Sequence, residues 1–158
     1  MIFVTVGHQM SFDRLVRWID LWKARHPEQD VFAQIGETTY RPQHIRSRTY
    51  LSPAEFEHVL GQASAVVAHA GTGTILSALY LGKPLLVVPR LGSLGETRND
   101  HQVGTAEHFA ALGLVRTARS EEEFMERVDT LSAFRPQATV GRTASPELIK
   151  RVTEFIGG

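Results

Sequence analysis

The sequence contains no cysteine among its 158 residues. Disulfide bonds and thiolate metal sites are therefore excluded, and cysteine usage gives no information about the redox compartment. The chain also lacks any apolar run approaching the roughly 20 residues of a membrane-spanning helix. Its apolar start, Met1 to Val6, has no basic flank and stops at Gly7, which is unlike a signal peptide. We therefore expect a cytoplasmic protein.

Net charge is also absent, because 17 Lys and Arg balance 17 Asp and Glu. Binding to nucleic acid needs a clustered positive field, so the composition argues against a nucleic-acid partner. Hydrophobic residues make up 42% of the chain and charged residues 22%, which is typical of a folded globular protein. The length fits one domain of ordinary size.

Short, wholly apolar stretches such as 65–68 and 85–88 are typical of strands buried on both faces of a parallel sheet. Amphipathic helices are expected between them. We therefore predict an α/β fold, a Rossmann-like parallel sheet with helices on both faces. Right-handed crossovers place the strand-to-helix loops on one rim, where such sheets bind ligands. Strands are expected at residues 2–6, 31–35, 48–51, 65–68, 85–88 and 114–116.

The strongest local signal is the segment from His69 to Thr74, between a predicted buried strand and a helix. Gly71 and Gly73 let the backbone approach a ligand closely, and the free N–H groups of a first helical turn favour phosphate. Thr72 and Thr74 add hydroxyl donors. The same residues also suit a tight turn followed by a capped helix, and the segment alone does not separate these two interpretations.

Two well-known nucleotide-binding motifs are excluded. A Walker A loop needs Gly-Lys followed by Ser or Thr at a helix start, whereas Lys83 is followed by Pro84 at a predicted helix end. A dinucleotide fingerprint needs a third glycine where Leu76 stands, and an acidic residue where the next strand ends at Arg90. The sequence therefore disfavours an NAD-dependent oxidoreductase.

A second signal is the polar stretch from Glu96 to Gln102, at the mouth of a helix whose later part is apolar. Side chains with paired donors and acceptors suit the hydroxyl groups of a sugar. The candidates are Asn99, Asp100, His101 and Gln102. The alternative is a solvated loop in which Asn99 or Asp100 caps the helix.

Gly7 and His8 follow the first predicted strand. Gly7 permits a sharp turn, and His8 can donate to a phosphate or titrate near neutral pH, although a lone histidine in a loop is usually just exposed. Glu107 and His108 are adjacent on a predicted helix and point in different directions, so we expect no metal site. No Ser-His-Asp order or carboxylate pair indicates hydrolase chemistry, and no catalytic residue is assigned.

Five motifs stand in a characteristic order along the chain. They are residues 4–7 (VTVG), 12–15 (FDRL), 69–74 (HAGTGT), 82–84 (GKP) with Pro89, and 99–102 (NDHQ). Together they resemble the C-terminal domain of glycosyltransferase family 28, over about residues 1–132. The similarity is greatest to small stand-alone subunits: the cytosolic catalytic subunit of the two-part N-acetylglucosaminyltransferase of dolichol-linked glycan synthesis, and the glucuronosyltransferase subunit of bacterial exopolysaccharide synthesis. The stretch 96–102 favours the bacterial exopolysaccharide branch.

This resemblance implies one half of a GT-B glycosyltransferase that binds a UDP-sugar as donor and needs no other cofactor. By position, the Gly7 loop and the helix start at 71–74 would hold the diphosphate, and the backbone near Leu51 would meet the uracil. His101 and Gln102 fall where relatives contact the sugar. The complete set of expected donor-binding residues is Gly7, His8, Leu51, His69, Gly71, Thr72, Gly73, Thr74, Ser77, Asn99, Asp100, His101 and Gln102.

Two positions depart from the family pattern. Ser77 stands where relatives with both domains in one chain use a Glu for the ribose, and a single hydroxyl cannot replace a carboxylate that accepts from both ribose oxygens. Thr105 stands where those relatives often have Asn. Both departures bear on which donor is bound, so glucuronate, glucose and N-acetylglucosamine all remain open as the transferred sugar.

The resemblance also implies a mechanism and partners. Transfer in the family inverts the anomeric carbon without an essential protein-bound metal, and the base that deprotonates the acceptor usually comes from the other domain. The missing half in the stand-alone relatives is a membrane-associated subunit that presents a lipid-linked acceptor, and it would recruit this chain to the inner face of the membrane. The alternative function is a non-catalytic module that binds a nucleotide or a partner.

The expected domain organisation follows from these observations. Residues 1–132 form the nucleotide-sugar-binding domain, and residues 133–144 form a linker. Residues 145–158 form a terminal helix, whose apolar side is our candidate for docking on the partner, although ordinary packing against the sheet explains it equally well. That side consists of Leu148, Val152, Phe155 and Ile156.

Overall fold

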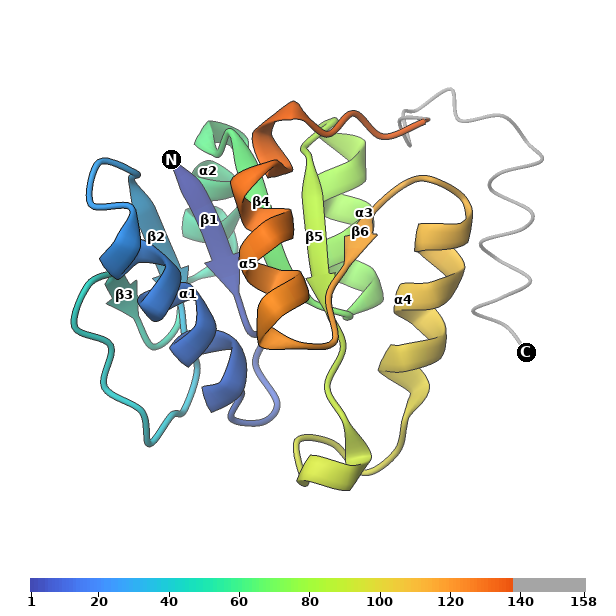
Figure 1. Ribbon diagram of the computed structural model, residues 1–158, viewed down its shortest axis with the longest axis horizontal. Coiled ribbons are helices and arrows are strands. Elements are labelled where there is room, and N and C mark those ends of the chain that lie inside the picture. Colours follow the sequence, from blue (N-terminus) through green and yellow to red (C-terminus); the bar gives the residue numbers. More distant parts are fainter. Residues whose placement is uncertain (138–158) are drawn as a thin grey trace.

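Six parallel strands form one sheet through the centre of the molecule (Figure 1). The computed structural model describes residues 1–137, so most of the expected linker and the whole of the expected terminal helix lie outside the described residues. The order across the sheet is β3-β2-β1-β4-β5-β6, the Rossmann-like arrangement that the sequence predicts. The strands are β1 (Ile2–Thr5), β2 (Val31–Gln34), β3 (Arg46–Arg48), β4 (Ala65–His69), β5 (Leu85–Val88) and β6 (Arg116–Thr117).

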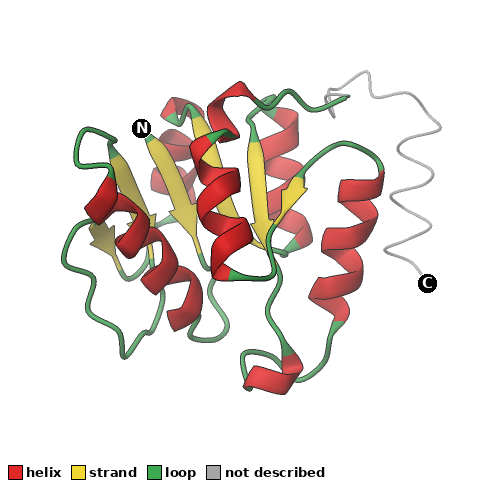
Figure 2. Ribbon diagram, in the orientation of Figure 1, coloured by secondary structure: helices red, strands yellow, loops and turns green. Residues whose placement is uncertain are grey.

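Helices cover both faces of this sheet, as expected (Figure 2). Helices α1 (Asp13–Arg25) and α5 (Glu121–Asp129) pack on one face. Helices α2 (Pro53–Gln62), α3 (Thr72–Tyr80) and α4 (His101–Ala111) pack on the other. Two short 3-10 helices, η1 (Gly92–Leu94) and η2 (Leu131–Ala133), complete the described structure. Within residues 1–137, no helix is both long and apolar enough to cross a bilayer.

Two hydrophobic cores lie on either side of the sheet. Ile2 and Val4 belong to the core that also contains Leu15 of α1, whereas Phe3 belongs to the core that contains Phe109 of α4. This alternation follows because neighbouring residues of a strand point to opposite faces. Burying a large apolar side chain contributes roughly 2–3 kcal/mol. The central strands are therefore fixed from both sides, and the loops at their carboxyl ends start from rigid positions.

Helices α1 and α2 begin in different ways. The sequence Ser52-Pro53-Ala54-Glu55 predicts a capping box at the start of α2. The structure confirms it, because the Ser52 hydroxyl accepts from the amide of Glu55 and the Glu55 carboxylate accepts from the amide of Ser52. The sequence also favours Ser11 as the N-cap of α1, and that prediction is wrong. Phe12 precedes the first helical residue and no side chain caps the helix. Ser11 instead stays in the loop, where its carbonyl oxygen accepts from Arg90.

The two outer strands lie elsewhere than the sequence predicts. The predicted strands span 48–51 and 114–116, whereas β3 is Arg46–Arg48 and β6 is Arg116–Thr117. An edge strand pairs through its backbone on one side only and leaves side chains in solvent, so apolar content does not mark its position. The apolar residues behind the prediction, Leu51, Leu114 and Val115, are buried next to these strands.

The direction of the crossovers changes between β1 and β4, which are neighbours in the sheet. β1 leads into α1 on one face, and β4 leads into α3 on the other. The loops that follow these two strands therefore diverge and leave a crevice at their carboxyl ends, which is where sheets of this kind bind ligands.

At the opposite end of α3, Lys83 donates to the carbonyl oxygens of Gly61 (2.6 Å) and Ala63 (2.7 Å). The Gly-Lys pair thus ends a helix, in keeping with the exclusion of a Walker A loop.

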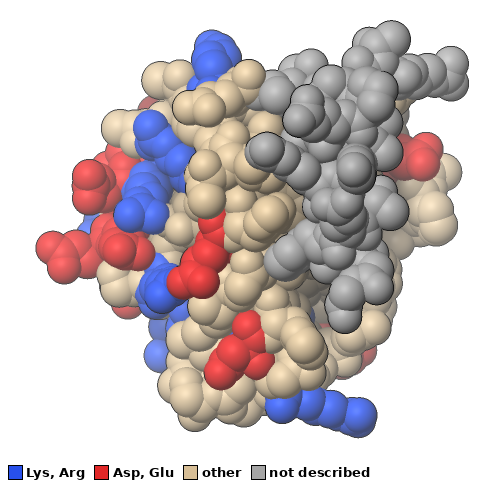
Figure 3. All heavy atoms as spheres, turned by 90° about the vertical axis from the view of Figure 1, so that its right-hand side faces the viewer, with Lys and Arg blue, Asp and Glu red and all other residues tan. Residues whose placement is uncertain are grey.

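Charge is not gathered on the face that Figure 3 turns toward the viewer, which is the right-hand side of Figure 1. Acidic and basic side chains lie side by side among uncharged ones on the described part of that face. On this described part of the face, the mixture of charges agrees with the balanced composition.

Candidate functional site

A cleft of about 380 Å³ opens at the crevice between β1 and β4. Its walls come from the ends of β1 and β2 and from the facing sides of α2 and α3. Six of the expected donor-binding residues line it: Gly7, His8, Leu51, Gly73, Thr74 and Ser77. The other lining residues are Thr5, Gln34, Pro53, Phe56 and Glu57, which the sequence does not single out.

The first turn of α3 presents unused backbone donors to this cleft. Gly71 is the N-cap of the helix, and no side chain caps it. Among the residues that the structure describes, none accepts a hydrogen bond from the amides of Thr72, Gly73 or Thr74. A Cβ atom added at Gly73 would have open space around it. These amides and the positive end of the helix dipole form a site that favours an anion such as a diphosphate.

The two glycines nearest the crevice make room for the ring of His69. Gly7 has a φ of 78°, and a Cβ atom there would lie 2.7 Å from the Nε2 and Cε1 atoms of His69. A Cβ atom at Gly71 would collide with Nε2 of the same ring. The sequence attributes Gly71 to the close approach of a ligand and Gly7 to a sharp turn, whereas the structure shows at both positions a steric reason that needs no ligand. A side chain at either position would displace His69.

His69 is held in its neutral form. Burial lowers the pKa of the imidazole to about 4, and the positive charge of Arg90 acts in the same direction. The Nδ1 atom is buried and makes no hydrogen bond of ordinary geometry with any described residue. A neutral imidazole carries one N–H donor and one acceptor. Because Nδ1 is buried, His69 can donate to a phosphate oxygen without adding a charge only in the tautomer whose proton is on Nε2.

The loop after β1 rests on a buried polar pair below the cleft. Thr5 donates through its hydroxyl to Oε1 of Gln34 (3.0 Å), and both side chains are almost fully buried. The amide of Gly7 donates to the same hydroxyl of Thr5 (3.3 Å). Nε2 of Gln34 lies 3.4 Å from Nε2 of His8, whose ring stacks on Tyr50 at 5.6 Å between ring centres. His8 is therefore positioned at the mouth of the cleft.

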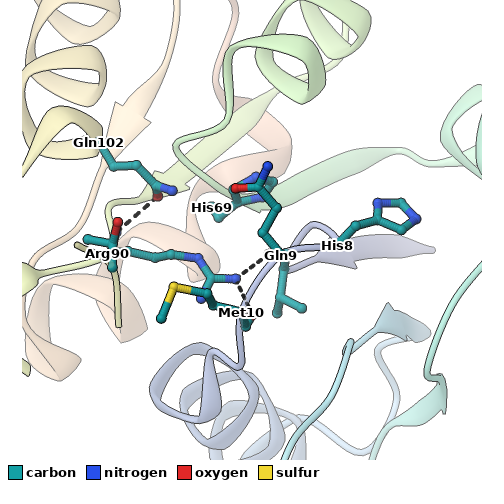
Figure 4. A pocket seen from close by; sticks show the side chains of 8 residues that line it. His8, Gln9, Met10, His69, Arg90 and Gln102 are labelled. Atoms are coloured by element: carbon teal, nitrogen blue, oxygen red, sulfur yellow. Dashed lines mark hydrogen bonds between the residues drawn. The ribbon is translucent and has the colours of Figure 1, made fainter. Parts of the chain in front are cut away.

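A smaller cavity of about 80 Å³ adjoins the first one, and its polar wall is built around Arg90 (Figure 4). The Arg90 side chain is 3% exposed, and it donates to the carbonyl oxygens of Val6 (2.7 Å), Met10 (2.6 Å) and Ser11 (2.5 Å). Its guanidinium also lies over the ring of Phe12, 4.7 Å from the centroid. Arg90 thereby fixes the backbone of the loop that carries His8, a role that the sequence does not reveal.

Four of the seven residues of the polar stretch 96–102 use a side-chain oxygen as a hydrogen-bond acceptor within the protein: Glu96, Asn99, Asp100 and Gln102. Oε1 of Gln102 accepts from the amides of Ala70 (3.2 Å) and Arg90 (3.1 Å), which ties α4 to the ends of β4 and β5. Asp100 accepts from the amide of Gly92, and Asn99 accepts from the amide of His101. Asp100 is the N-cap residue of α4, but its side chain makes no capping bond.

Glu96 has a comparable structural role at the start of that stretch. Its carboxylate accepts from Nε and Nη2 of Arg14, both at 2.8 Å, and from the amide of Leu91 at 2.9 Å. This bidentate pair joins α1 to the loop after β5. The Nε2 group of Gln102 stays available beside the smaller cavity, which His69 and His8 also line (Figure 4).

The structure therefore divides the expected residues into four groups. The first lines the larger cleft, and the second, consisting of His69, Gln102 and His8, which also belongs to the first group, lines the smaller cavity. Gly71 and Thr72, the third group, start α3 and are lining residues of neither cavity. The fourth group, Asn99, Asp100 and His101, is exposed and lines neither cavity. Among residues 1–137, no cluster of three or more His, Asp or Glu side chains is arranged to hold a metal ion.

The model of the glycosyltransferase family 28 C-terminal domain matches residues 1–153. The chain belongs to this family. As a family 28 domain, it is 33% identical over 107 residues to the UDP-N-acetylglucosamine transferase subunit ALG13 of Cryptococcus neoformans var. neoformans serotype D. That match covers 66% of this chain and 51% of the relative, so the chain spans about half the length of that relative.

A bacterial relative matches over a shorter part of the family 28 domain. It is a UDP-N-acetylglucosamine–N-acetylmuramyl-(pentapeptide) pyrophosphoryl-undecaprenol N-acetylglucosamine transferase of Bacillus thuringiensis, 35% identical over 82 residues. The match covers 49% of this chain and 22% of the relative. Both relatives are named as transferases of N-acetylglucosamine.

Solved structures place the family 28 domain among GT-B glycosyltransferase domains. An NMR structure of ALG13 superposes with a TM-score of 0.66 at 19% identity, over 99% of this chain and 96% of that one. The calicheamicin glycosyltransferase CalG4 superposes with a TM-score of 0.62 at 22% identity, over 98% of this chain and 37% of the larger enzyme. At these identities the similarity establishes the fold, and the fold class predicted from the sequence is confirmed.

Proposed function

We propose that this protein is the donor-binding catalytic subunit of a two-chain inverting glycosyltransferase that uses a UDP-sugar. The observation that carries the proposal is the first turn of α3. The amides of Thr72, Gly73 and Thr74 have no acceptor among residues 1–137, and Gly73 and Thr74 line a cleft at the crossover point between β1 and β4. Membership of family 28 supports the same reading. UDP-N-acetylglucosamine, the donor named for the relatives, is one candidate beside UDP-glucuronate and UDP-glucose.

The chemistry assigned to this chain is stabilisation of the departing UDP. As the bond from the anomeric carbon to the β-phosphate oxygen breaks, negative charge develops on the diphosphate. The amides of Thr72 to Thr74 and a neutral His69 can stabilise that charge by donating hydrogen bonds to it. These donors are already in position before the reaction, which is how preorganised sites lower an activation barrier. The group that deprotonates the acceptor belongs, in this proposal, to the partner chain. The cleft lies at an open rim where a second domain can complete it.

The partner in this proposal is a membrane-associated subunit that presents a lipid-linked acceptor. The word subunit in the name of the ALG13 relatives supports a two-part enzyme. The expected docking element, the apolar side of 145–158, lies outside the described residues and stays a prediction. We further propose a cytoplasmic location with recruitment to the inner face of the membrane, and a role in bacterial exopolysaccharide synthesis based on the stretch 96–102.

Calorimetric titration tests the donor proposal directly. UDP, UDP-N-acetylglucosamine, UDP-glucuronate and UDP-glucose are titrated into the protein, with NADH as the control for an oxidoreductase. Binding of UDP and of at least one UDP-sugar, and no binding of NADH, is the expected result. If no uridine nucleotide binds, alone or with the partner chain present, the proposal fails.

A transfer assay separates a catalytic subunit from a non-catalytic binding module. The protein is mixed with its membrane-associated partner, a lipid-linked acceptor and a radiolabelled UDP-sugar. We expect labelled acceptor and free UDP only when both chains are present. Nucleotide binding without any transfer in the complete mixture would support the binding module instead.

A further inference from the structure

One carboxylate in the cleft has no partner. Glu57 lies on α2, one turn after Pro53 and next to Phe56, and all three residues line the cleft. Among the residues that the structure describes, none forms a hydrogen bond or an ion pair with the Glu57 side chain. Glu55, two residues earlier, makes both kinds of contact, with Ser52 and Arg48. The free carboxylate of Glu57 is therefore available to a ligand.

Glu57 on α2 and Ser77 on α3 face the same two hollows. Both residues line the cleft, and both also line the apolar groove that continues from it between the same two helices. They consequently lie along the edge that the two hollows share. Within the described part of the cleft wall, Glu57 is the only side chain that carries a carboxylate. The other polar side chains there are neutral or, in His8, basic.

The position along α3 matches the length of a nucleotide. Ser77 follows Gly73 by four residues, which is one helical turn, or roughly 6 Å along the axis. With a diphosphate on the first turn of α3, the attached ribose can reach the part of the same cleft that Ser77 and Glu57 line. The two adjacent hydroxyls of a ribose are donors, and a carboxylate can accept from both at once, whereas a serine hydroxyl offers one short oxygen.

We propose that Glu57 accepts hydrogen bonds from the 2′ and 3′ hydroxyls of the donor ribose, with Ser77 beside it, and so selects ribonucleotides over deoxyribonucleotides. This inference rests on the proposed function, because it needs a nucleoside diphosphate in the cleft. Glu57 on α2 would thus supply the carboxylate for the ribose, because α3 has Ser77 rather than an acidic residue at that position. Glu57 would accordingly be a specificity-determining residue rather than part of the diphosphate site.

The test compares UDP with 2′-deoxy-UDP. Removing a carboxylate near a diphosphate also removes an electrostatic repulsion, which would strengthen the binding of both ligands. The ratio of the two dissociation constants is free of that effect, because both ligands carry the same phosphates. Hydrogen bonds to a charged group predict that the wild-type protein binds UDP about tenfold more tightly than 2′-deoxy-UDP.

Glu57→Gln is expected to reduce that ratio to about two or less. Ser77→Ala is expected to leave most of it, and Glu122→Gln, which removes an exposed carboxylate from the first turn of α5, is the control that leaves all of it. A wild-type ratio near one, or an unchanged ratio in Glu57→Gln, overturns the inference while the proposed function stands. If UDP fails to bind the wild-type protein, both fail together.

Discussion

The first turn of α3 and the loop between β5 and α4 make opposite use of their polar groups. In the α3 turn, the amides of Thr72, Gly73 and Thr74 have no acceptor among the described residues, and a Cβ atom at Gly73 would meet open space. The loop is rich in polar side chains, yet Glu96, Asp100 and Gln102 accept hydrogen bonds from Arg14 or from backbone amides. A polar sequence therefore does not by itself mark a ligand site. Unpaired donors at the wall of a cleft, such as the amides of Gly73 and Thr74, are the more direct indication.

The difference also separates binding from support. The α3 turn is the part that can contact the diphosphate, whereas the loop holds the ends of β4, β5 and α1 in their positions. Mutations in the two regions should accordingly affect different measurements. Changes at the α3 turn should lower affinity and leave stability intact, and changes in the loop should lower stability first.

The largest expected effect is the loss of UDP binding in Gly73→Asp. The new carboxylate would occupy open space at the start of α3, where it suits the helix dipole, so the free protein should be as stable as the wild type. It would also repel the diphosphate, and we expect affinity for UDP to fall about a thousandfold, or ~4 kcal/mol. Calorimetric titration measures the affinity, and urea unfolding measures the stability.

Gly104→Asp is the matched control for that substitution. Gly104 lies in the first turns of α4, and a Cβ atom there also has open space. If Gly104→Asp weakens UDP binding as strongly as Gly73→Asp, the diphosphate site is not confined to α3. Gly71→Val is a poorer probe, because its side chain would collide with His69 and disturb the fold as well.

The second effect concerns stability in Arg90→Leu. Three carbonyl oxygens of the loop after β1 would lose their donor, and we expect the free energy of unfolding to fall by about 3 kcal/mol. Urea unfolding measures the change. Arg98→Leu, in an exposed part of the same connection, should alter it by less than about 0.5 kcal/mol. Equal losses in the two variants would show that Arg90 does not hold the loop.

A smaller loss of stability is expected in Gln102→Ala. The amides of Ala70 and Arg90 would lose their acceptor, at a cost of about 2 kcal/mol. Asn99→Ala removes only one exposed contact and should be nearly neutral. Thermal unfolding of both variants provides the comparison. A neutral Gln102→Ala would contradict the role of Gln102 as a clamp between the strand ends.

The smallest effect is a dependence of stability on pH through His69. Its folded pKa of about 4 is below the unfolded value, so between pH 6.5 and 4 the unfolded state binds a proton that the folded state does not. Stability should therefore fall as the pH falls through this window, by about 1.5 kcal/mol once the partial exposure of the ring is allowed for. In His69→Asn this part of the slope should vanish, whereas in His101→Asn it should persist. Urea unfolding at several pH values decides between these outcomes.

The sequence predicts the parts of the molecule that depend on local pattern. Apolar runs locate the four central strands, and the alternation of strands and helices implies a rim on which the loops at Gly7 and Gly71 meet. The capping box at Ser52 and the helix end at Lys83 are equally local signals. The bounds of the edge strands β3 and β6 are not predicted correctly, because their exposed side chains carry no apolar pattern.

Contacts between distant segments are the part that the sequence does not predict. Arg14 and Glu96 are 82 residues apart, and the partners of Arg90 in the first loop are about as distant. A charged residue such as Asp20 on an amphipathic helix is expected to face solvent. Asp20 is instead buried, and its carboxylate accepts from the amides of Gln43 and His44. The place of Glu57 in the cleft is likewise visible only once α2 and α3 are packed together.

The most direct test of the central claim is an amide NMR spectrum recorded during titration with UDP. If the first turn of α3 binds the diphosphate, the amide signals of Thr72, Gly73 and Thr74 should show the largest shifts and should saturate together. The signals of Asn99 to Gln102 should move much less. Saturating shifts that cluster elsewhere, with the three α3 amides unmoved, would contradict the account.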